Sequence, residues 1–287
     1  MDRPDLERAT DAATAVVRSV GLPVDVATVL HDSNKLALRL EPCGVLARVA
    51  PVGHEVARME VGLAGQLARA GSPVGALEPR VAPRVHVRDG FAVTLWVYYE
   101  PVAPVVPPDD YARALERLHA GMRGVEGRFP RFTERIAEAE RIVADPALSP
   151  ALPDVERRFL GDRLRRLHEA VDGAGREQVL HGEPHPGNVL STQDGPLFID
   201  LETCCRGPVE FDLAHVPDEV SGHYRGVDRG LLDRCRELVL AMVAAWRWDR
   251  EDQFPDGPRF GEELLRALRA GPPWPTLDAV VRRVAGP

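Results

Sequence analysis

The chain has 287 residues, of which 44% are apolar and 28% charged, enough for one large or two small globular domains with a sizeable core. Its formal net charge of −8 disfavours a nucleic-acid partner. No run of 18 apolar residues predicts a membrane span, and the polar N-terminus does not resemble a signal peptide. The four cysteines have neither disulfide-framework nor metal-ligand spacing, so we expect a reduced, cytoplasmic protein.

The first third of the chain predicts a small antiparallel sheet. Residues 36–40 (LALRL) and 44–50 (GVLARVA) have the composition of two strands joined by a tight turn. Residues 84–98 (RVHVRDGFAVTLWVY) predict a further hairpin, and the Asp89-Gly90 pair marks its turn.

An ion pair is expected between this sheet and the helix that follows it. Residues 54–71 have helical periodicity, with Val56 and Leu63 on one face. Glu60 falls on that same apolar face, where a carboxylate needs a cation. Arg48 lies within an apolar strand and needs a partner for the same reason. We therefore predict that Arg48 pairs with Glu60.

The rest of the chain is predicted to be mainly helical. A proline-rich run, PVAPVVPPDD (101–110), is typical of a linker. It divides the chain into expected lobes of residues 1–97 and 98–287. Helical periodicity in the second lobe covers residues 111–122, 154–171, 231–248 and 262–270.

The most informative segment is LHGEPHPGNVLSTQDGPLFID (180–200). It places a carboxylate at Glu183, an amide at Asn188 and a second carboxylate at Asp200, after a short apolar strand. Phosphoryl transfer requires a positioned hydroxyl and metal ions held against phosphates. Asn188 and Asp200 can supply the oxygen ligands that Mg²⁺ prefers, and Glu183 can accept a proton or orient the hydroxyl. Glycines and prolines keep this loop out of a helix.

At this point the sequence resembles the aminoglycoside phosphotransferase and choline kinase-like small-molecule kinases. Their signature, HGD followed by N, ID and DLA, reads here as 181–183 (HGE), Asn188, 199–200 (ID) and 212–214 (DLA). The resemblance implies an α+β, two-lobed, protein kinase-like fold with a small antiparallel-sheet lobe and a larger, mainly helical lobe. It also implies ATP or GTP as donor and Mg²⁺.

The resemblance implies roles for residues of the first lobe. Ser33, Asn34 and Lys35 lie where the family covers the nucleotide phosphates, and Lys35 is the only lysine of the chain. Arg48 takes the place of the usual strand lysine. With Glu60 it would form the strand-to-helix pair whose base reaches the α- and β-phosphates.

Two further roles follow from the same resemblance. The segment from Trp96 to Tyr99 would be the hinge strip whose backbone grips the adenine, with Trp96, Val97 and Tyr98 as nucleotide contacts. Asp212, which is expected to begin a helix, would hold the catalytic loop in place without taking part in the chemistry. The terminal helices would border the acceptor site.

The expected acceptor is a small hydroxylated molecule. Residues 181–220 contain eight acids and one base, which favours a cationic acceptor such as an aminoglycoside or another antibiotic. Choline, homoserine and sugar acceptors remain open, as do a monomer and a homodimer. The twelve residues from Asp200 to Asp212 are too few for an activation loop with a peptide platform, which disfavours protein substrates.

Two competing interpretations also follow from the sequence. Glu183 is one methylene longer than Asp, and Arg48 replaces a lysine, so the chain could be a nucleotide-binding pseudokinase. The intact pair Asn188 and Asp200 argues for activity. The H-x-E-x-H pattern from His181 to His185 could indicate zinc, but its glycine and prolines preclude the helix that zinc motifs of this kind use.

Overall fold

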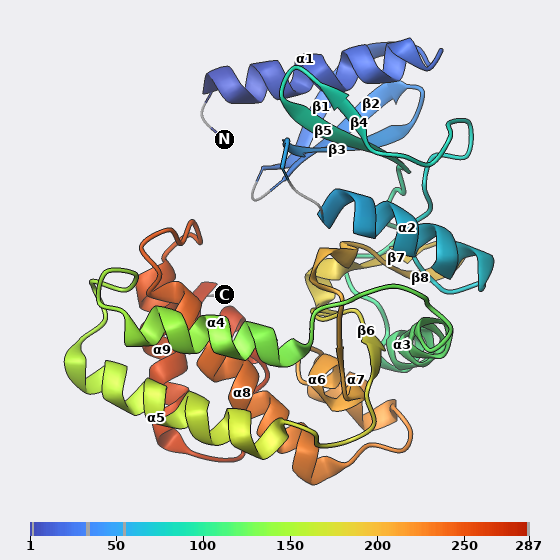
Figure 1. The fold of residues 1–287 in the computed structure, drawn as a ribbon. Coiled ribbons are helices and arrows are strands. Elements are labelled where there is room, and N and C mark those ends of the chain that lie inside the picture. Colours follow the sequence, from blue (N-terminus) through green and yellow to red (C-terminus); the bar gives the residue numbers. More distant parts are fainter. Residues whose placement is uncertain (2, 33–34, 54–55, 286–287) are drawn as a thin grey trace. The chain divides into compact units, whose positions relative to one another are not determined.

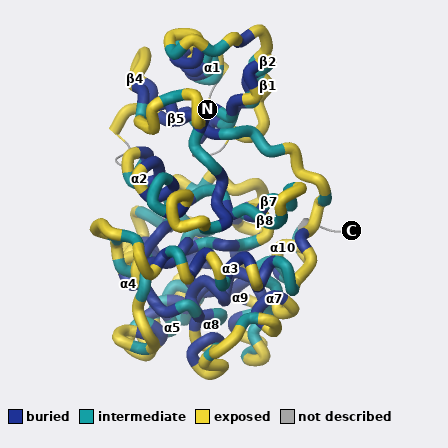
Figure 2. Tube along the Cα trace, turned by 90° about the vertical axis from the view of Figure 1, so that its right-hand side faces the viewer, coloured by how far each residue is buried: buried dark blue, intermediate teal, exposed yellow. Residues whose placement is uncertain are grey.

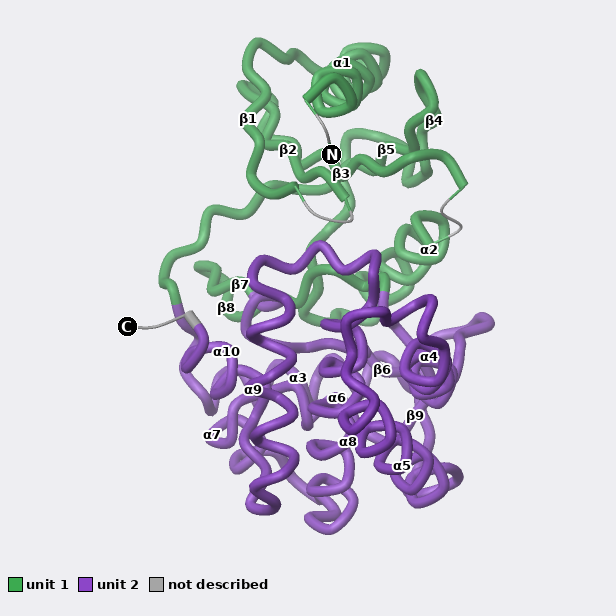
Figure 3. The backbone as a smooth tube through the Cα atoms, turned by 90° about the vertical axis from the view of Figure 1, so that its left-hand side faces the viewer, with its two compact units in different colours: residues 1–104, 190–202 green, residues 105–189, 203–287 purple. Residues whose placement is uncertain are grey.

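A computed structural model describes residues 1, 3–32, 35–53 and 56–285. The chain forms two compact units, residues 1–104 with 190–202 and residues 105–189 with 203–287 (Figure 3). The first unit includes 190–202, a segment that the predicted division into 1–97 and 98–287 assigns to the second lobe.

The first unit is built on an antiparallel five-stranded sheet with strand order β1-β2-β3-β5-β4 (Figure 1). Its strands are β1 (Val24–Asp32), β2 (Leu36–Pro42), β3 (Val45–Pro51), β4 (His86–Arg88) and β5 (Phe91–Val97). Its helices are α1 (Arg3–Ser19) and α2 (Val56–Arg69). The predicted strands, the helix between them and the turn at Asp89-Gly90 are all confirmed, and both turn residues have positive φ.

Helix α1 covers one face of this sheet. Small residues of α1 pack on alternate, fully buried residues of β2 and β3, such as Leu38 and Ala47. Because side chains alternate along a strand, Arg48 lies on the opposite face. The helix stripe consists of Ala9, Ala12, Ala13, Val16 and Val17.

The hairpin of β7 (Val189–Thr192) and β8 (Gly195–Phe198) brings residues 190–202 into the first unit. The backbone of Phe198 exchanges hydrogen bonds with Pro73 and Gly75, at 2.8 and 2.9 Å. The N–H of Val102 donates to Ser191 at 2.8 Å. These bonds attach residues 190–202 to other segments of the first unit.

The second unit is mainly helical, and its core is formed around α8, whose buried residues are visible in Figure 2. The predicted helix 154–171 is confirmed to the residue. The helices of the second unit are α3 (Pro108–Met122), α4 (Phe132–Ala144), α5 (Asp154–Val171), α6 (Val209–Leu213), α7 (Asp218–His223), α8 (Arg229–Arg247), α9 (Gly257–Ala270) and α10 (Leu277–Ala285). The short elements of this unit are β6 (Gln178–Leu180), β9 (Cys205–Gly207) and the 3₁₀ turn η1 (Pro186–Asn188), and a second 3₁₀ turn, η2 (Leu201–Thr203), spans the boundary between the units.

A small antiparallel ladder supports the predicted catalytic loop, residues 181–188. Strands β6 and β9 pair from Gln178–Gly207 to Leu180–Cys205, so the loop begins directly where β6 ends. None of the described helices is long and apolar enough to span a membrane.

Candidate active site

In the first unit, a chain of alternating charges joins α2 to the strands. Glu60 is almost fully buried, and each of its oxygens has a cation: Arg48 Nη1 at 2.7 Å and Lys35 Nζ at 2.5 Å. Arg48 Nη2 also contacts Asp200 Oδ1 at 2.5 Å, and Lys35 contacts Glu202 Oε2 at 2.5 Å. The predicted Arg48–Glu60 pair is confirmed.

Lys35 and Glu202 extend this network beyond the predicted pair. Lys35 directly precedes β2 and is buried between two carboxylates, rather than being a solvated loop residue. Burial alone would lower the pKa of Arg48, but Glu60 and Asp200 raise it above its ordinary value. Arg48 therefore stays charged, as a phosphate contact requires.

Asp200 follows β8 in a left-handed conformation, with φ of 62°. Aspartate tolerates this region better than most residues, and such backbone is frequent where a side chain is held for function. Its side chain is 31% exposed. Among the described residues only Oδ1 is engaged, by Arg48, so Oδ2 can accept a further ligand.

The strip predicted to contact the nucleotide has its backbone N–H groups and its indole N–H engaged within the protein. Trp96 is buried, and its indole N–H donates to Thr94 Oγ1 at 2.8 Å. The N–H groups of Val97 and Tyr98 donate to the carbonyls of Ala76 and Gly44, at 2.9 and 3.2 Å. Adenine contacts from Val97 and Tyr98 would therefore use carbonyl groups. Ser33 and Asn34 lie outside the described residues.

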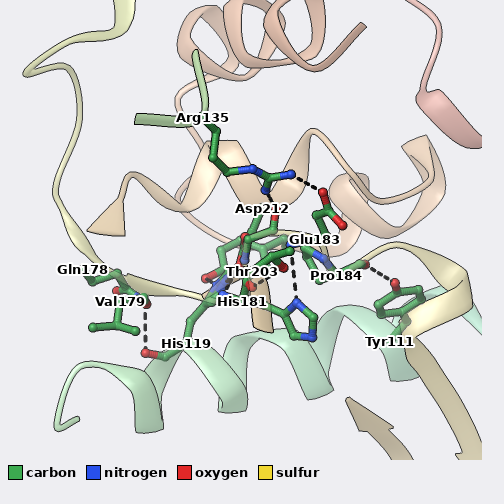
Figure 4. Close-up of polar contacts among 12 residues, drawn as sticks. Tyr111, His119, Arg135, Gln178, Val179, His181, Glu183, Pro184, Thr203 and Asp212 are labelled. Carbon is green, nitrogen blue, oxygen red and sulfur yellow. Dashed lines mark hydrogen bonds and ion pairs between the residues drawn. The ribbon is translucent and has the colours of Figure 1, made fainter. Parts of the chain in front are cut away.

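In the second unit, Asp212 holds the start of the catalytic loop (Figure 4). Its oxygens accept the N–H groups of His181 and Gly182, at 2.9 and 2.8 Å, and contact His119 Nε2 at 2.9 Å. Burial would raise the pKa of Asp212, but the hydrogen bond and charge of His119 lower it. The predicted supporting role is confirmed. The prediction that Asp212 begins a helix is wrong, because Asp212 lies near the end of α6, where its side chain can reach back to the loop.

The loop itself is closely packed. Gly182 has φ of 90°, and a Cβ there would lie 2.0 Å from the carbonyl oxygen of Thr203, so only glycine fits. The Tyr111 hydroxyl donates to the carbonyl of Pro184. Asn188 Nδ2 donates to the carbonyl of Glu183 at 3.0 Å, which fixes the amide and leaves its oxygen for another ligand. The loop is therefore rigid, as a site for positioning requires.

Glu183 has an unpredicted partner. Arg135, from α4, contacts Glu183 Oε1 through Nη2 and the carbonyl of Gly182 through Nη1, the latter at 3.2 Å. Burial would raise the pKa of Glu183, but the charges of Arg135 and His215 lower it to about 2. Glu183 is therefore an ionised hydrogen-bond acceptor at neutral pH. Nothing in the sequence motif indicated its pairing with Arg135.

The acidity of residues 181–220 is largely compensated by partners from outside the segment. Five of its eight acids contact a basic side chain that lies elsewhere in the chain. The pairs are Glu183–Arg135, Asp200–Arg48, Glu202–Lys35, Asp212–His119 and Asp218–Arg236. The sequence count therefore overstates the negative field available to an acceptor.

The donor set of the predicted metal ligands suits magnesium. One oxygen remains on Asn188 and one on Asp200 among the described contacts, and Mg²⁺ takes one or two protein oxygens with phosphate and water. Over the described part of the chain, no group of three or more His, Cys, Asp or Glu side chains could hold a metal ion.

Residues 32–280 match the model of the phosphotransferase enzyme family. The chain belongs to this family. The resemblance drawn from the HGE, Asn188, ID and DLA elements is thereby confirmed. Family membership supports a phosphotransferase.

Solved structures confirm the kinase-like fold of this phosphotransferase. An amicoumacin kinase in complex with AMP-PNP, Ca²⁺ and Ami has a TM-score of 0.70 at 12% identity, over 95% of this chain and 97% of that chain. A choline/ethanolamine kinase family protein from Mesorhizobium loti has a TM-score of 0.68 at 18% identity, over 98% of this chain and 99% of that chain. The GDP and kanamycin complex of APH(2")-IIia has a TM-score of 0.69 at 16% identity, over 90% of this chain and 98% of that chain.

Proposed function

We propose that the protein is a small-molecule kinase that transfers the γ-phosphate of ATP or GTP to a hydroxyl group. The observation that carries this proposal is the rigid loop that presents Glu183 and Asn188, on a chain whose other unit holds Asp200 beside Arg48. The two similar structures that contain AMP-PNP or GDP support a nucleotide donor. Its four cysteines are free, which suits a reducing, cytoplasmic setting.

Asn188 and Asp200 are the proposed Mg²⁺ ligands. Magnesium at these oxygens would neutralise charge on the phosphates during transfer. Arg48 supplies a planar guanidinium that suits phosphate oxygens, and Lys35 supplies a compact second cation. Glu60 keeps both cations on one side of the sheet until a nucleotide competes for them.

Glu183 is proposed to orient the acceptor hydroxyl. One of its oxygens is held by Arg135, and among the described residues the other has no hydrogen-bond partner. That oxygen can accept the hydroxyl proton. Because phosphoryl transfer passes through a loose transition state, alignment of the nucleophile contributes more than early proton removal. As the new O–P bond forms, the bond between the γ-phosphorus and the β–γ bridging oxygen breaks, the nucleoside diphosphate leaves, and the hydroxyl proton passes to Glu183.

The acceptor is proposed to be a hydroxylated antibiotic, such as an aminoglycoside, or another amine-bearing molecule. This rests on the ligands named for the similar structures, amicoumacin and kanamycin, and on the choline/ethanolamine kinase family protein. The acidic segment supports a cationic acceptor less than the sequence count indicates, because most of its acids are paired. Homoserine and sugars are the metabolite alternatives for the screen.

The test is a nucleotide-consumption screen over hydroxylated antibiotics and metabolites. We expect turnover with at least one acceptor and its loss in Asp200→Ala. Asp194→Ala is the matched control, because Asp194 is exposed in the adjacent hairpin turn and should leave the rate unchanged. Tight nucleotide binding without turnover across the whole panel would instead support the pseudokinase.

A further inference from the structure

Arg135 lies outside every motif of this chain, on α4, yet its guanidinium reaches the centre of the catalytic loop (Figure 4). It contacts both the backbone carbonyl of Gly182 and the side chain of Glu183. Its guanidinium carbon also lies 4.9 Å from the ring centroid of Trp246, on α8. Three separate contacts therefore fix one side chain.

These contacts match the one substitution that distinguishes this loop. Glutamate has one more methylene than aspartate, and hence one more rotatable bond between backbone and carboxylate. A displacement of about 1 Å at a reacting group can cost about 100-fold in rate. The side chain of Glu183 is 26% exposed, so packing alone does not hold it. Arg135, only 17% exposed, supplies the missing constraint on Oε1.

The geometry of the pair leaves the chemistry accessible. Arg135 binds Oε1, and Oε2 has no hydrogen-bond partner within the described ranges. Because the same guanidinium also binds Gly182, the backbone and the carboxylate are fixed to one rigid group. The cation–π contact with Trp246 further restrains the position of that group.

We propose that Arg135 is a positioning residue that holds Glu183 in its working position and so allows glutamate to replace the shorter acid. This inference rests on the proposed kinase function. It adds a third element, α4, to the parts that assemble the catalytic site. It also means that the negative charge of Glu183 is already compensated by Arg135 before an acceptor binds, so recognition of a cationic acceptor would depend on other groups.

The test compares Arg135→Gln with Arg141→Gln, a control on the same helix whose side chain is exposed. We expect Arg135→Gln to lower kcat about 100-fold while the KM for nucleotide changes less than about twofold. Arg135→Lys should retain an intermediate kcat, because an ammonium can make one of the two contacts but not both. Arg141→Gln should match the unmodified protein.

Two further measurements separate positioning from a general effect on folding. Added guanidinium should raise the kcat of Arg135→Ala, whereas urea, an uncharged molecule of the same shape, should not. Glu183→Asp should lower kcat strongly with Arg135 present and much less in the Arg135→Gln background, because the two side chains act as a unit.

The outcomes are distinct. An Arg135→Gln rate equal to that of Arg141→Gln, or additive effects in the double variant, would overturn the positioning role. An increase in kcat would show that Arg135 restrains the enzyme. Absence of turnover by the unmodified protein with every acceptor would refute the proposed function itself, and nucleotide affinity would then show whether the fold is intact.

Discussion

Each unit of the molecule pairs an arginine with a glutamate, but the two pairs differ in burial. Glu60 has a 2% exposed side chain and contacts both Arg48 and Lys35. Glu183 is 26% exposed, and Arg135 is the one ion-pair partner within the described residues. A carboxylate on an apolar helix face must have a cation, whereas a half-exposed one need not. The first pair was therefore predictable, and the second was not.

The same difference separates stability from rate. Removing one member of a buried pair leaves an uncompensated charge in the core, whereas a partly exposed carboxylate can be hydrated. We therefore expect substitutions in the Glu60 network to affect folding first and substitutions at Glu183 to affect turnover first. Four predictions test this contrast.

The largest effect is expected at Glu183. Glu183→Gln removes the charge that accepts the hydroxyl proton, and kcat should fall about 10²- to 10⁴-fold. The nucleotide dissociation constant should change little. Steady-state kinetics and isothermal titration measure these quantities together. A loss of nucleotide affinity equal to the loss in kcat would contradict the separation of roles.

Glu60→Ala should instead destabilise the fold by about 3–5 kcal/mol, because Arg48 loses one of its partners inside the first unit. Denaturant unfolding of the purified protein measures this difference. The exposed pair Arg113–Asp109 provides a control, since Arg113→Ala should change the free energy of unfolding far less than Glu60→Ala. Equal effects at the two positions would argue against a buried network around Glu60.

Asp212→Asn should cost about 1–3 kcal/mol, because the amide cannot accept both loop N–H groups and His119 as the carboxylate does. The pKa of Asp212 is lowered in the folded protein. Its contribution to the free energy of unfolding is therefore complete above the pKa of aspartate in the unfolded chain, ~3.9. It is lost as the pH falls through the lower, folded value. The stability difference from Asp212→Asn should thus be full at neutral pH and shrink in acid; a pH-independent difference would exclude this linkage.

The smallest effect is expected at Lys35. Lys35→Arg keeps the charge and the pairing with Glu60 and Glu202, but not the compact ammonium. We expect about a tenfold rise in the KM for nucleotide, which corresponds to about 1.4 kcal/mol, with a smaller change in kcat. If KM does not move, Lys35 serves only the ion-pair network.

Much of the fold followed from periodicity. Strands β2, β3 and β5 and helices α2 and α5 were predicted because their apolar residues recur at the spacing of the element. Helix α1 has the same periodicity, but its buried face consists mainly of alanine, which indicates a buried face less clearly than leucine does. Strand β1 is exposed along most of its length, so it has no buried alternation to read.

The site was predictable where a motif fixes both partners. The loop from Glu183 to Asn188 and its support by Asp212 follow from residues that all belong to the motif. Arg135 and Lys35 are brought to their partners only by the packing of distant elements. Arginine is abundant in this chain, and nothing in the sequence of α4 distinguishes Arg135 from its exposed neighbours.

The most direct test of the central claim is the magnesium dependence of phosphoryl transfer to an acceptor found in the screen. If Asn188 and Asp200 hold the metal, Asn188→Ala should require more magnesium for half-maximal rate, and Asp200→Ala more still. Glu183→Gln should lower the maximal rate with the same magnesium requirement. Unchanged half-saturation in both metal-ligand variants would contradict the assignment of Asn188 and Asp200.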